Sequence, residues 1–393
     1  MAEELSYVIT TPHTLVKSRT GGILSRLFSR VDLDLVAAQV FTPDYETVDA
    51  YAKSVVKHDK SDLPERTQLL NQYIRNSMMP GSNRPHRVAL FLFRGENAVS
   101  QLMDHVGAIF PENRTVELLT GETIRDTYAD LVRDENGNII YFEPAVLTPR
   151  SRQSAEENLR IFTSFMKKQN NVVSNLNYPN PQKIQKTLVI IKPDNWKARS
   201  IRPGSIIDMF SRTGLRIVGM KVYQMSPAEA LDFYGAVLKV LEKKVAPEAS
   251  RRAVEILEKE FSLTLEADYR AELSESFGKA YSRHEFNRII EFMSGLRPDG
   301  LSKAGMEKPG TVKSMCLVYE GVNAVQAIRN VLGPTDPLSA PGGTIRRDFG
   351  SNVMVNAVHA SDSPENAERE FNIVKIHENN LTNLVEEFYS WKK

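Results

Sequence analysis

The sequence has few of the features that would tie it to a special environment. Its 393 residues include one cysteine, Cys316, so no intrachain disulfide can form. No apolar run approaches the roughly 20 residues needed to span a bilayer. The first residues, from Met1 to Leu5, lack the pattern of a secretory signal. These absences predict a protein of the reducing cytoplasm with no membrane partner, in which Cys316 is a small buried apolar residue.

An excess of charge is also missing. The chain has 50 Lys and Arg against 49 Asp and Glu, a formal net charge of +1. No global field therefore favours nucleic acid or an anionic surface, and any basic cluster must be local. Hydrophobic residues make up 41% of the chain, which is enough for the cores of two or three domains.

An internal repeat organises the chain. Five pairs of segments recur in the same order, each pair with similar residues: 5–13 and 186–194, 28–30 and 210–212, 93–99 and 319–325, 123–125 and 344–346, and 155–157 and 367–369. The last pair places Leu147 opposite His359. We therefore interpret the chain as two copies of one domain, of which only the second carries the histidine.

The repeat sets the expected boundaries. Copy one is residues 1–165 and copy two is residues 186–374. An Asn- and Pro-rich linker at 166–185 separates them. Residues 375–393 carry apolar residues at helical spacing, which predicts an amphipathic C-terminal helix that docks on the body or on a neighbour.

The periodicity of copy two predicts an α+β fold. Strands are expected at about 186–192, 215–225, 313–320 and 353–358, with helices at 203–213, 322–332 and from 364. This order predicts helices on one face of a largely antiparallel sheet. The stretch at about 235–281, rich in Glu, Lys, Ala and Leu, predicts a helical insertion.

Candidate site residues gather at strand ends. His359 follows the strand predicted at 353–358, and Lys192 ends the first strand of copy two. Arg329, Thr335, Arg346 and Arg347 come from the helix and loop between the last two strands. Cations around a histidine suit phosphoryl transfer, which depends on positioning and on positive charge near the transferring group.

A histidine nucleophile also needs an acceptor for its second ring nitrogen, and Glu370 on the following helix is a candidate. Each residue also has an ordinary interpretation. A strand-end histidine can simply bond to the backbone, and Lys, Arg and Glu are usually exposed.

Together these segments resemble the signature blocks of nucleoside diphosphate kinases. The resemblance covers roughly residues 186–374 and rests on six segments in the same order: Lys192-Pro193-Asp194, 321–325, Arg329, 333–337, 343–350 and 356–363. It implies two ferredoxin-like (βαββαβ) domains, each with a four-stranded antiparallel sheet. It also implies a ping-pong reaction in which a nucleoside triphosphate phosphorylates a histidine, which then phosphorylates a nucleoside diphosphate. Mg²⁺ would arrive on the nucleotide phosphates, with no protein metal site.

The resemblance assigns roles residue by residue. His359 would be the nucleophile, Glu370 its orienting acceptor, and Tyr234 would lie near the transferring group. The residues implied around the nucleotide phosphates and sugar are Lys192, Arg329, Thr335, Arg346 and Asn356. The base would stack on an aromatic residue, for which Phe286 fits only if the register shifts by one.

Copy one departs from the family pattern at nearly every chemical position. Copy one has Thr11 opposite Lys192, Met103 opposite Arg329, Pro144 opposite Asn356, Leu147 opposite His359 and Asn158 opposite Glu370. Only Arg125 matches its counterpart, Arg346. Leucine has no lone pair, so copy one is expected to be catalytically silent. The family's assembly from dimers implies that the two copies form an internal pseudo-dimer, with further homo-oligomers.

Two other functions stay open at this point. The chain could be a nucleotide-binding scaffold or sensor whose insertion has abolished turnover, although a nucleophile with its orienting acid argues against that. Nucleic-acid binding through Arg346 and Arg347 is disfavoured by the near-neutral charge and the lack of interleaved basic and aromatic residues.

Overall fold

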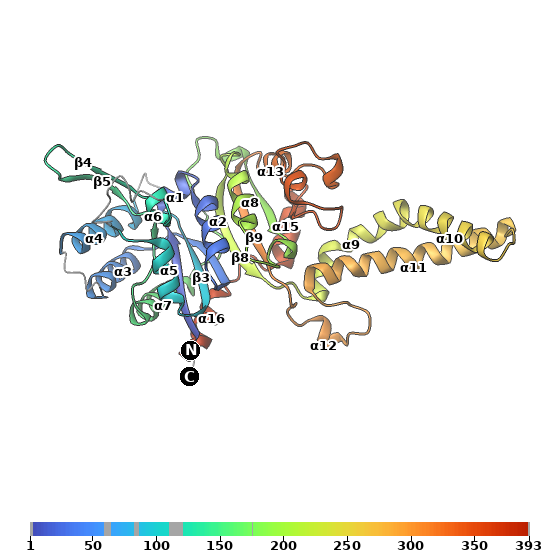
Figure 1. Cartoon of the computed structure of the whole chain (residues 1–393), viewed down its shortest axis with the longest axis horizontal. Coiled ribbons are helices and arrows are strands. Elements are labelled where there is room, and N and C mark those ends of the chain that lie inside the picture. Colours follow the sequence, from blue (N-terminus) through green and yellow to red (C-terminus); the bar gives the residue numbers. More distant parts are fainter. Residues whose placement is uncertain (1–2, 59–63, 82–85, 110–120, 175, 392–393) are drawn as a thin grey trace. The chain divides into compact units, whose positions relative to one another are not determined.

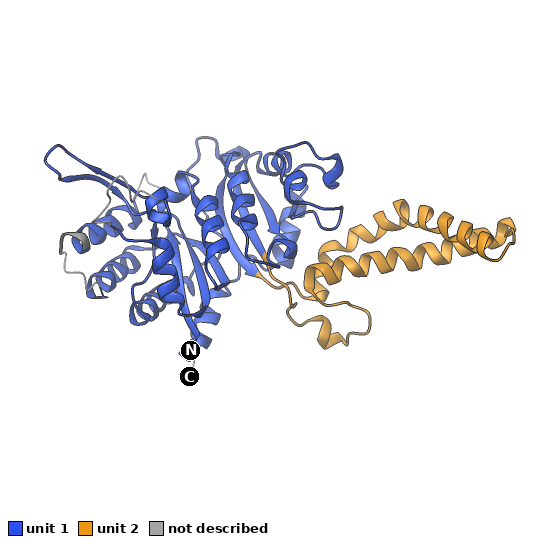
Figure 2. Cartoon of the chain, in the orientation of Figure 1, with its two compact units in different colours: residues 1–222, 315–393 blue, residues 223–314 orange. Residues whose placement is uncertain are grey.

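The computed structural model describes residues 3–58, 64–81, 86–109, 121–174 and 176–391. The chain divides into two compact units, which Figure 2 shows in different colours. Unit 1 comprises residues 1–222 and 315–393, and unit 2 comprises residues 223–314. Unit 1 therefore holds both predicted copies, and unit 2 holds the insertion.

Copy one folds around a four-stranded sheet with the strand order β2-β3-β1-β6. Its elements are β1 (Glu3–Thr10), α1 (Pro12–Val16), α2 (Thr20–Arg30), β2 (Asp34–Phe41), α3 (Tyr45–His58), α4 (Pro64–Met78), β3 (Val88–Glu96), α5 (Ala98–Val106), α6 (Ile124–Tyr128), β4 (Asp130–Arg133), β5 (Ile139–Glu143), β6 (Val146–Leu147) and α7 (Arg152–Met166). Strands β4 and β5 form a separate two-stranded hairpin.

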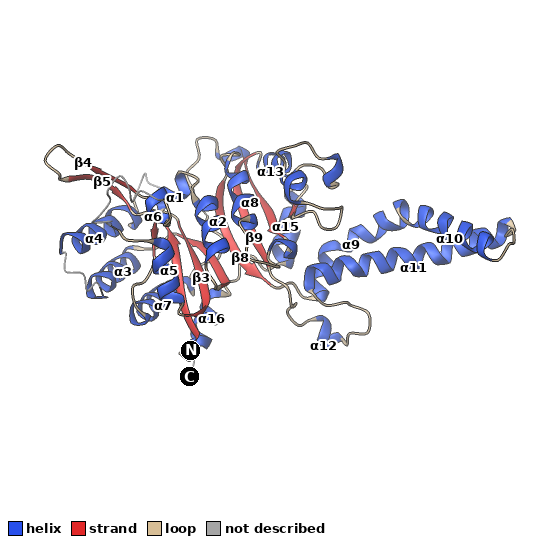
Figure 3. Ribbon diagram, in the orientation of Figure 1, coloured by secondary structure: helices blue, strands red, loops and turns tan. Residues whose placement is uncertain are grey.

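Copy two repeats this plan with the order β8-β9-β7-β10. Its elements are η2 (Pro181–Lys183), β7 (Ile184–Ile191), η3 (Pro193–Asn195), α8 (Arg202–Ser211), β8 (Arg216–Tyr223), β9 (Ser314–Val322), α13 (Ala324–Leu332), η4 (Pro337–Ser339), α14 (Ile345–Phe349), β10 (Val358–Ala360) and α15 (Pro364–Ile373). Corresponding strands occupy corresponding places, so the structure confirms the predicted tandem of α+β domains. Figure 3 shows both sheets with their helices.

The two copies contact each other through equivalent helices. Helix α2 of copy one packs along α8 of copy two within unit 1 (Figure 1). Glycines allow the close approach, because a Cβ added at Gly21 would lie 2.4 Å from the backbone N of Asp208. One added at Gly204 would lie 2.2 Å from the backbone N of Ser25. The helix pair therefore depends on having no side chain at these two positions.

The linker predicted at 166–185 is ordered against copy two where it is described. The backbone N–H of Val173 donates to the carbonyl of Val218 at 2.8 Å, and Asn171 is 2% exposed. The Asn171 amide donates to the carbonyl of Met220 at 3.1 Å. The linker sequence lacks a helical or strand period because its backbone is irregular, although it packs against copy two.

The C-terminal helix docks on the body, although its predicted bounds of 375–393 are too wide. The helix is α16 (Leu381–Phe388), and Leu381 and Val385 are fully buried in the hydrophobic core of copy one. Lys375 adopts a positive φ of 49°, which ends regular backbone after α15 and delays the start of α16. The end of the chain therefore completes the core of its first domain.

Unit 2 is wholly helical. It contains α9 (Pro227–Lys244), α10 (Ala246–Glu260), α11 (Ala267–Ser294) and α12 (Lys303–Met306). The insertion predicted at about 235–281 is therefore longer than expected at both ends. Ser226 caps α9 through a reciprocal capping box with Glu229, and Gly295 ends α11 with a left-handed φ of 76°.

Candidate active site

His359 lies on β10, the edge strand of the copy-two sheet. Strand β10 pairs antiparallel with β7, and His359 stands opposite Ile190. Its neighbours Val358 and Ala360 are buried, whereas the imidazole is 20% exposed. The ladder fixes the backbone at this position, so the ring is held rigidly while part of it stays accessible.

Glu370 holds the imidazole from the following helix. Its Oε2 lies 3.0 Å from Nε2 of His359, and the carboxylate is buried. Ser363 caps α15 by accepting the backbone N–H of Asn366, which fixes the start of the helix that carries Glu370. With Nε2 donating to the carboxylate, the ring lone pair lies on Nδ1. The geometry thus orients a histidine whose Nδ1 can act as a nucleophile.

The backbone before His359 makes a tight turn. Ala357 has a φ of +66°, and the N–H of Val358 donates to the carbonyl of Asn356 at 2.8 Å. A three-residue turn with positive φ is strained for a residue other than glycine. It also shows that the strand predicted at 353–358 was wrong in its bounds, because extended pairing begins only after this turn. His359 lies inside the strand rather than beyond its end.

Lys192 and Asn356 meet beside this turn. The Lys192 ammonium donates to Oδ1 of Asn356 at 2.7 Å, and the Asn356 amide donates to the carbonyl of Thr335 at 3.0 Å. Burial, followed by repulsion from Arg346, lowers the pKa of Lys192 to about 8, with Asp194 opposing the shift. Two cations kept close together under low exposure favour an anionic ligand.

Arg346 braces the same segment from α14. Its guanidinium donates to the carbonyl of Gly333 at 3.1 Å and to that of Val358 at 3.2 Å, and the residue is 9% exposed. The predicted residues Thr335 and Arg329 are exposed on the loop and the helix that precede α14. The structure thus joins His359, Glu370, Lys192, Asn356 and Arg346 through the segment around β10.

The remaining two predicted residues belong to unit 2. Tyr234 lies on α9 and Phe286 on α11, and they are 9% and 5% exposed. The ring of Tyr234 packs against Phe233, with centroids 4.9 Å apart. Their roles stay predictions.

Sequence reasoning missed two polar residues that organise the site. The Ser361 hydroxyl donates to Oε2 of Glu370 at 2.6 Å, and the Asn195 amide donates to the carbonyl of Ala357 at 2.8 Å. Ser361 lies in a polar stretch, Ser361-Asp362-Ser363, whose residue types are usual in turns and helix caps, so its residue type alone does not point to Glu370. Asn195 follows Lys192 in a short buried turn, and its spacing alone gave no sign of a contact with residue 357.

The register of copy one confirms that leucine replaces the histidine. Leu147 on β6 pairs with Ile9 of β1, just as His359 on β10 pairs with Ile190 of β7. The preceding turn is also kept, because Ala145 has a φ of +60°. Copy one therefore preserves the backbone of the site without its histidine.

The arginine shared by both copies makes the same contacts in each. Arg125 donates to the carbonyls of Gly107 and Val146 at 2.5 and 3.0 Å. These residues correspond to Gly333 and Val358, the partners of Arg346. The conserved contacts indicate that this arginine supports the turn and the edge strand in both copies, which explains its survival in copy one.

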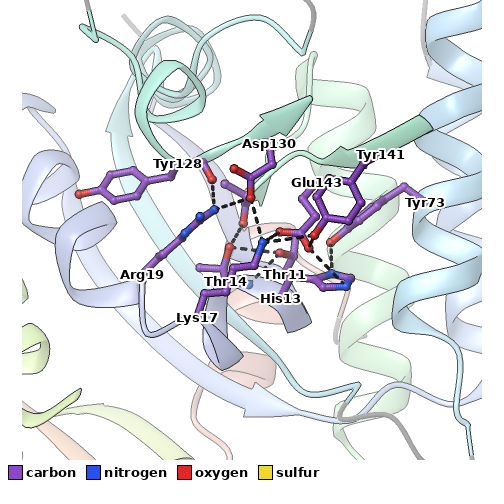
Figure 4. A network of polar contacts seen from close by, with 11 residues as sticks. Thr11, His13, Thr14, Lys17, Arg19, Tyr73, Tyr128, Asp130, Tyr141 and Glu143 are labelled. Carbon is purple, nitrogen blue, oxygen red and sulfur yellow. Dashed lines mark hydrogen bonds and ion pairs between the residues drawn. The ribbon is translucent and has the colours of Figure 1, made fainter. Parts of the chain in front are cut away.

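A different polar cluster occupies the corner of copy one after β1 (Figure 4). Thr11, the counterpart of Lys192, caps α1. Lys17 contacts Oε2 of Glu143 at 2.6 Å and Oδ2 of Asp130 at 2.9 Å. Burial acts to lower the pKa of Lys17, but the hydrogen bonds to Glu143 and Asp130 outweigh this effect, so the pKa is raised. Because both carboxylates belong to the β4–β5 hairpin, this cluster anchors the hairpin to α1.

The part of the chain that the structure describes offers no cluster of metal ligands. Within the described ranges, three or more His, Cys, Asp or Glu side chains do not come together as metal ligands. The site buries the cations of Lys192 and Arg346 and the amide of Asn356, which suit an anionic ligand, while its buried carboxylate, Glu370, contacts His359. Among the same residues, none of the helices combines the length and apolar character that crossing a membrane requires.

Comparison with known proteins places this site in a family. The model of the nucleoside diphosphate kinase family matches residues 185–245 and 269–379. A nucleoside diphosphate kinase of Pyrobaculum aerophilum is 33% identical over 197 residues, which cover 48% of this chain and 92% of the relative. The chain belongs to the nucleoside diphosphate kinase family.

Other members of the nucleoside diphosphate kinase family match to a similar extent. The enzyme so named in Bdellovibrio bacteriovorus is 32% identical over 187 residues, covering 48% of this chain and 89% of its own. A crystal structure of an NDP kinase from Pyrobaculum aerophilum is 29% identical and covers 50% of this chain and 100% of its own, with a TM-score of 0.33. The family model matches copy two and leaves residues 246–268 unmatched.

Proposed function

We propose that this protein is a nucleoside diphosphate kinase in which copy two, residues 186–374, is the catalytic domain and His359 carries the phosphoryl group. The observation that carries the proposal is the 3.0 Å contact between Nε2 of His359 and Glu370. It directs the lone pair to Nδ1, and the buried cations Lys192 and Arg346 lie around the same segment.

The reaction would proceed in two half-reactions. In the first, Nδ1 of His359 forms a bond to the γ-phosphorus while the bond between that phosphorus and its bridging oxygen breaks, and a nucleoside diphosphate leaves. In the second, a terminal phosphate oxygen of another diphosphate attacks the same phosphorus, and the nitrogen–phosphorus bond breaks. Glu370 would stabilise the positive charge that develops on the imidazole while phosphorus is bound.

The other residues would bind and position the nucleotide. Lys192 and Arg346 would offset the charge of the phosphates, and Asn356 would hold Lys192 in place. The exposed residues Arg329 and Thr335 would contact the phosphates from the solvent side. Tyr234 would lie near the transferring group and Phe286 would stack on the base. Mg²⁺, bound to the nucleotide phosphates, would neutralise charge on the transferring group.

Copy one, residues 1–165, would have a supporting role. Equivalent helices of the two copies already pack together, which supports an internal pseudo-dimer. Leu147 and Asn158 leave no nucleophile with an orienting acid in copy one. The single buried cysteine fits a cytoplasmic location.

The direct test is to incubate the protein with Mg²⁺ and γ-labelled ATP without an acceptor. We expect protein-bound label that is stable in alkali, labile in acid and released as GTP when GDP is added. His359→Ala should abolish labelling while nucleotide binding persists. His377→Ala, a histidine outside the site, is the control and should label normally. Nucleotide binding without any labelling of the native protein would favour the sensor function instead.

A further inference from the structure

A cavity of about 250 Å³ lies within unit 1 where the two copies meet. We call it the inter-copy cavity. Helix α2 and the turn before it line the copy-one side, and α8 with the start of β8 lines the copy-two side. Its lining residues Val16, Ser18 and Gly214 are exposed, so the cavity opens to solvent. Its volume is slightly below the roughly 300–1,000 Å³ of typical ligand sites, which limits it to a small ligand.

The place that corresponds to this cavity when the two copies are exchanged is filled by an aromatic ring. The repeat aligns three pairs of residues around the two places: Leu15 with Trp196, Phe28 with Phe210, and Phe93 with Tyr319. Trp196 packs edge-on against Phe28, with ring centroids 5.4 Å apart. On the cavity side, Leu15 stands in the place of this tryptophan. The smaller side chain therefore leaves open a space that is closed on the other side.

Three buried polar residues line the inter-copy cavity. Thr20, Arg87 and Tyr319 are 3%, 5% and 1% exposed. One terminal nitrogen of Arg87 donates to the carbonyl of Ile217. However, Nε of Arg87, Oγ1 of Thr20 and the hydroxyl of Tyr319 have no hydrogen-bond partner among the residues that the structure describes. Buried polar atoms are rarely left unbonded, so these three atoms point to a bound molecule.

The charge of the cavity is positive. Arg87 and Arg216 line it, and none of its described lining residues is acidic. Burial, followed by repulsion from Arg216, lowers the pKa of Arg87 to about 10, while Tyr178 and Glu320 oppose the shift. Glu320 lies outside the lining and pairs with Lys186 at 3.6 Å. Two cations at one cavity without a lining carboxylate favour an anionic ligand.

Helix α2 begins at this cavity. Its first residues, Thr20 and Gly21, line it, and no side chain in the described part of the chain caps this end of the helix. The N–H groups of a first helical turn have no intrahelical partner, and the helix dipole makes this end positive, which suits phosphate. The apolar residues Leu15, Ile207 and Leu215 complete the walls and suit an organic group.

We propose that the inter-copy cavity binds the phosphate group of a small phosphate ester. Nε of Arg87 and the hydroxyls of Thr20 and Tyr319 donate to the phosphate oxygens, together with the first turn of α2. The organic part of the ester lies against the apolar walls. Because the donors come from both copies, the ligand joins them. The site shares no residue with the candidate active site, so it does not depend on phosphoryl transfer at His359.

Isothermal titration calorimetry of the full-length protein tests the proposal. The probe is phenyl phosphate, and benzyl alcohol is its neutral counterpart with a similar ring. Saturating Mg²⁺ and ADP are present throughout, so that the proposed nucleotide site is already occupied. We expect the native protein to bind phenyl phosphate at one site and benzyl alcohol at least about tenfold more weakly, because the charged ligand satisfies the buried donors.

Two substitutions taken from the opposite side of the repeat locate the binding site. Leu15→Trp introduces the residue found at position 196 and should abolish binding by filling the cavity. Tyr319→Phe introduces the residue found at position 93, removes one donor and should weaken binding by about tenfold. Leu263→Trp and Tyr73→Phe make the same changes outside the cavity and are the matched controls. Circular dichroism would check that each variant is folded.

Loss of binding in Leu15→Trp and weaker binding in Tyr319→Phe, with both controls unchanged, would support the proposal. A native protein that does not bind phenyl phosphate, or binding that neither cavity variant alters, would overturn it, and the cavity would then hold only water. Benzyl alcohol that binds as tightly as phenyl phosphate would overturn the assignment of phosphate, since the apolar walls alone would account for binding.

Discussion

One oxygen of Glu370, Oε2, lies within hydrogen-bonding distance of both His359 and Ser361. The distances are 3.0 Å to Nε2 of His359 and 2.6 Å to Oγ of Ser361. Ser361 is fully buried, and its backbone N–H donates to the carbonyl of Leu188 on β7. The acid that orients the histidine is therefore itself tied to the central part of the sheet, and it cannot turn without breaking that connection.

Removing the Ser361 hydroxyl should slow turnover. We predict that Ser361→Ala lowers kcat several-fold with little change in nucleotide affinity, because Glu370 loses a fixed donor while Lys192 and Arg346, the proposed phosphate ligands, keep their positions. The free energy of unfolding should fall by about 1–2 kcal/mol. Steady-state kinetics and urea unfolding would measure the two effects. Ser151→Ala is the control, since losing the equivalent cap of α7 in copy one should destabilise the fold by about 1 kcal/mol with kcat nearly unchanged. Equal kcat losses in both variants would contradict the specific role of Ser361.

Nucleotide affinity should depend on pH through Lys192, whose pKa is lowered to about 8 by burial and by Arg346. Below this pKa the ammonium is already charged when phosphate arrives. Above it, binding must take up a proton, because the phosphates favour the charged form. We therefore predict that ADP affinity falls as pH rises from about 8, by at most about tenfold per pH unit.

Calorimetric titrations in buffers of different ionisation enthalpy would detect this proton uptake. Lys192→Arg is the informative comparison, because a guanidinium stays charged across the range. The Lys192→Arg variant should bind ADP more weakly than the native protein, with an affinity that does not change with pH. A native enzyme whose ADP affinity is equally flat would show that Lys192 is not the titrating group.

Substituting each of the two equivalent arginines should distinguish a role in stability from a role in phosphoryl transfer. Each donates to two backbone carbonyls, so Arg125→Met and Arg346→Met should each lower the free energy of unfolding by about 2–3 kcal/mol. Only Arg346→Met should also reduce phosphoryl transfer strongly, because in copy one Leu147 stands in the place of the proposed nucleophile, His359. Thermal unfolding and transfer assays on the same preparations would test this. A large activity loss in Arg125→Met at a temperature where it remains folded would mean that copy one takes part in catalysis.

Restoring the histidine to copy one should not restore chemistry. We predict that Leu147→His in a His359→Ala background accepts no label from γ-labelled ATP. Asn158, which stands in the place of Glu370, donates its amide to the hydroxyl of Tyr7 at 2.8 Å and cannot supply a carboxylate. Thr11 likewise replaces the buried lysine. Label at residue 147 would show that positioning of the ring alone is sufficient.

Much of this arrangement could be predicted from sequence because the repeat preserves short local signals. The order of strands and the alignment of Leu147 with His359 follow from matching segments, and the pairing of Glu370 with the histidine follows from the place of Glu370 on the next helix and from the family resemblance. Ser361 and Asn195 could not be found, because their contacts depend on how a turn folds back. The bounds of the last strand were predicted wrongly because they also depend on this turn, and an alanine at position 357 does not indicate a positive φ.

The insertion illustrates a second limit. Composition correctly predicted helices at about 235–281, but periodicity could not show that they form a unit of their own. Nor could spacing decide whether the C-terminal helix would pack on copy one, on copy two or on a neighbour. Such choices depend on which surfaces remain uncovered after the separate parts have folded.

The burial of Leu381 and Val385 in the core of copy one has a consequence during synthesis. The first domain leaves the ribosome lacking two of its core side chains, and they follow only after all of copy two has been translated. At about 5–20 residues per second, this interval lasts roughly 10–40 seconds. During that time the nascent first half must expose an apolar groove or be shielded by a chaperone, and docking of α16 becomes the step that seals it.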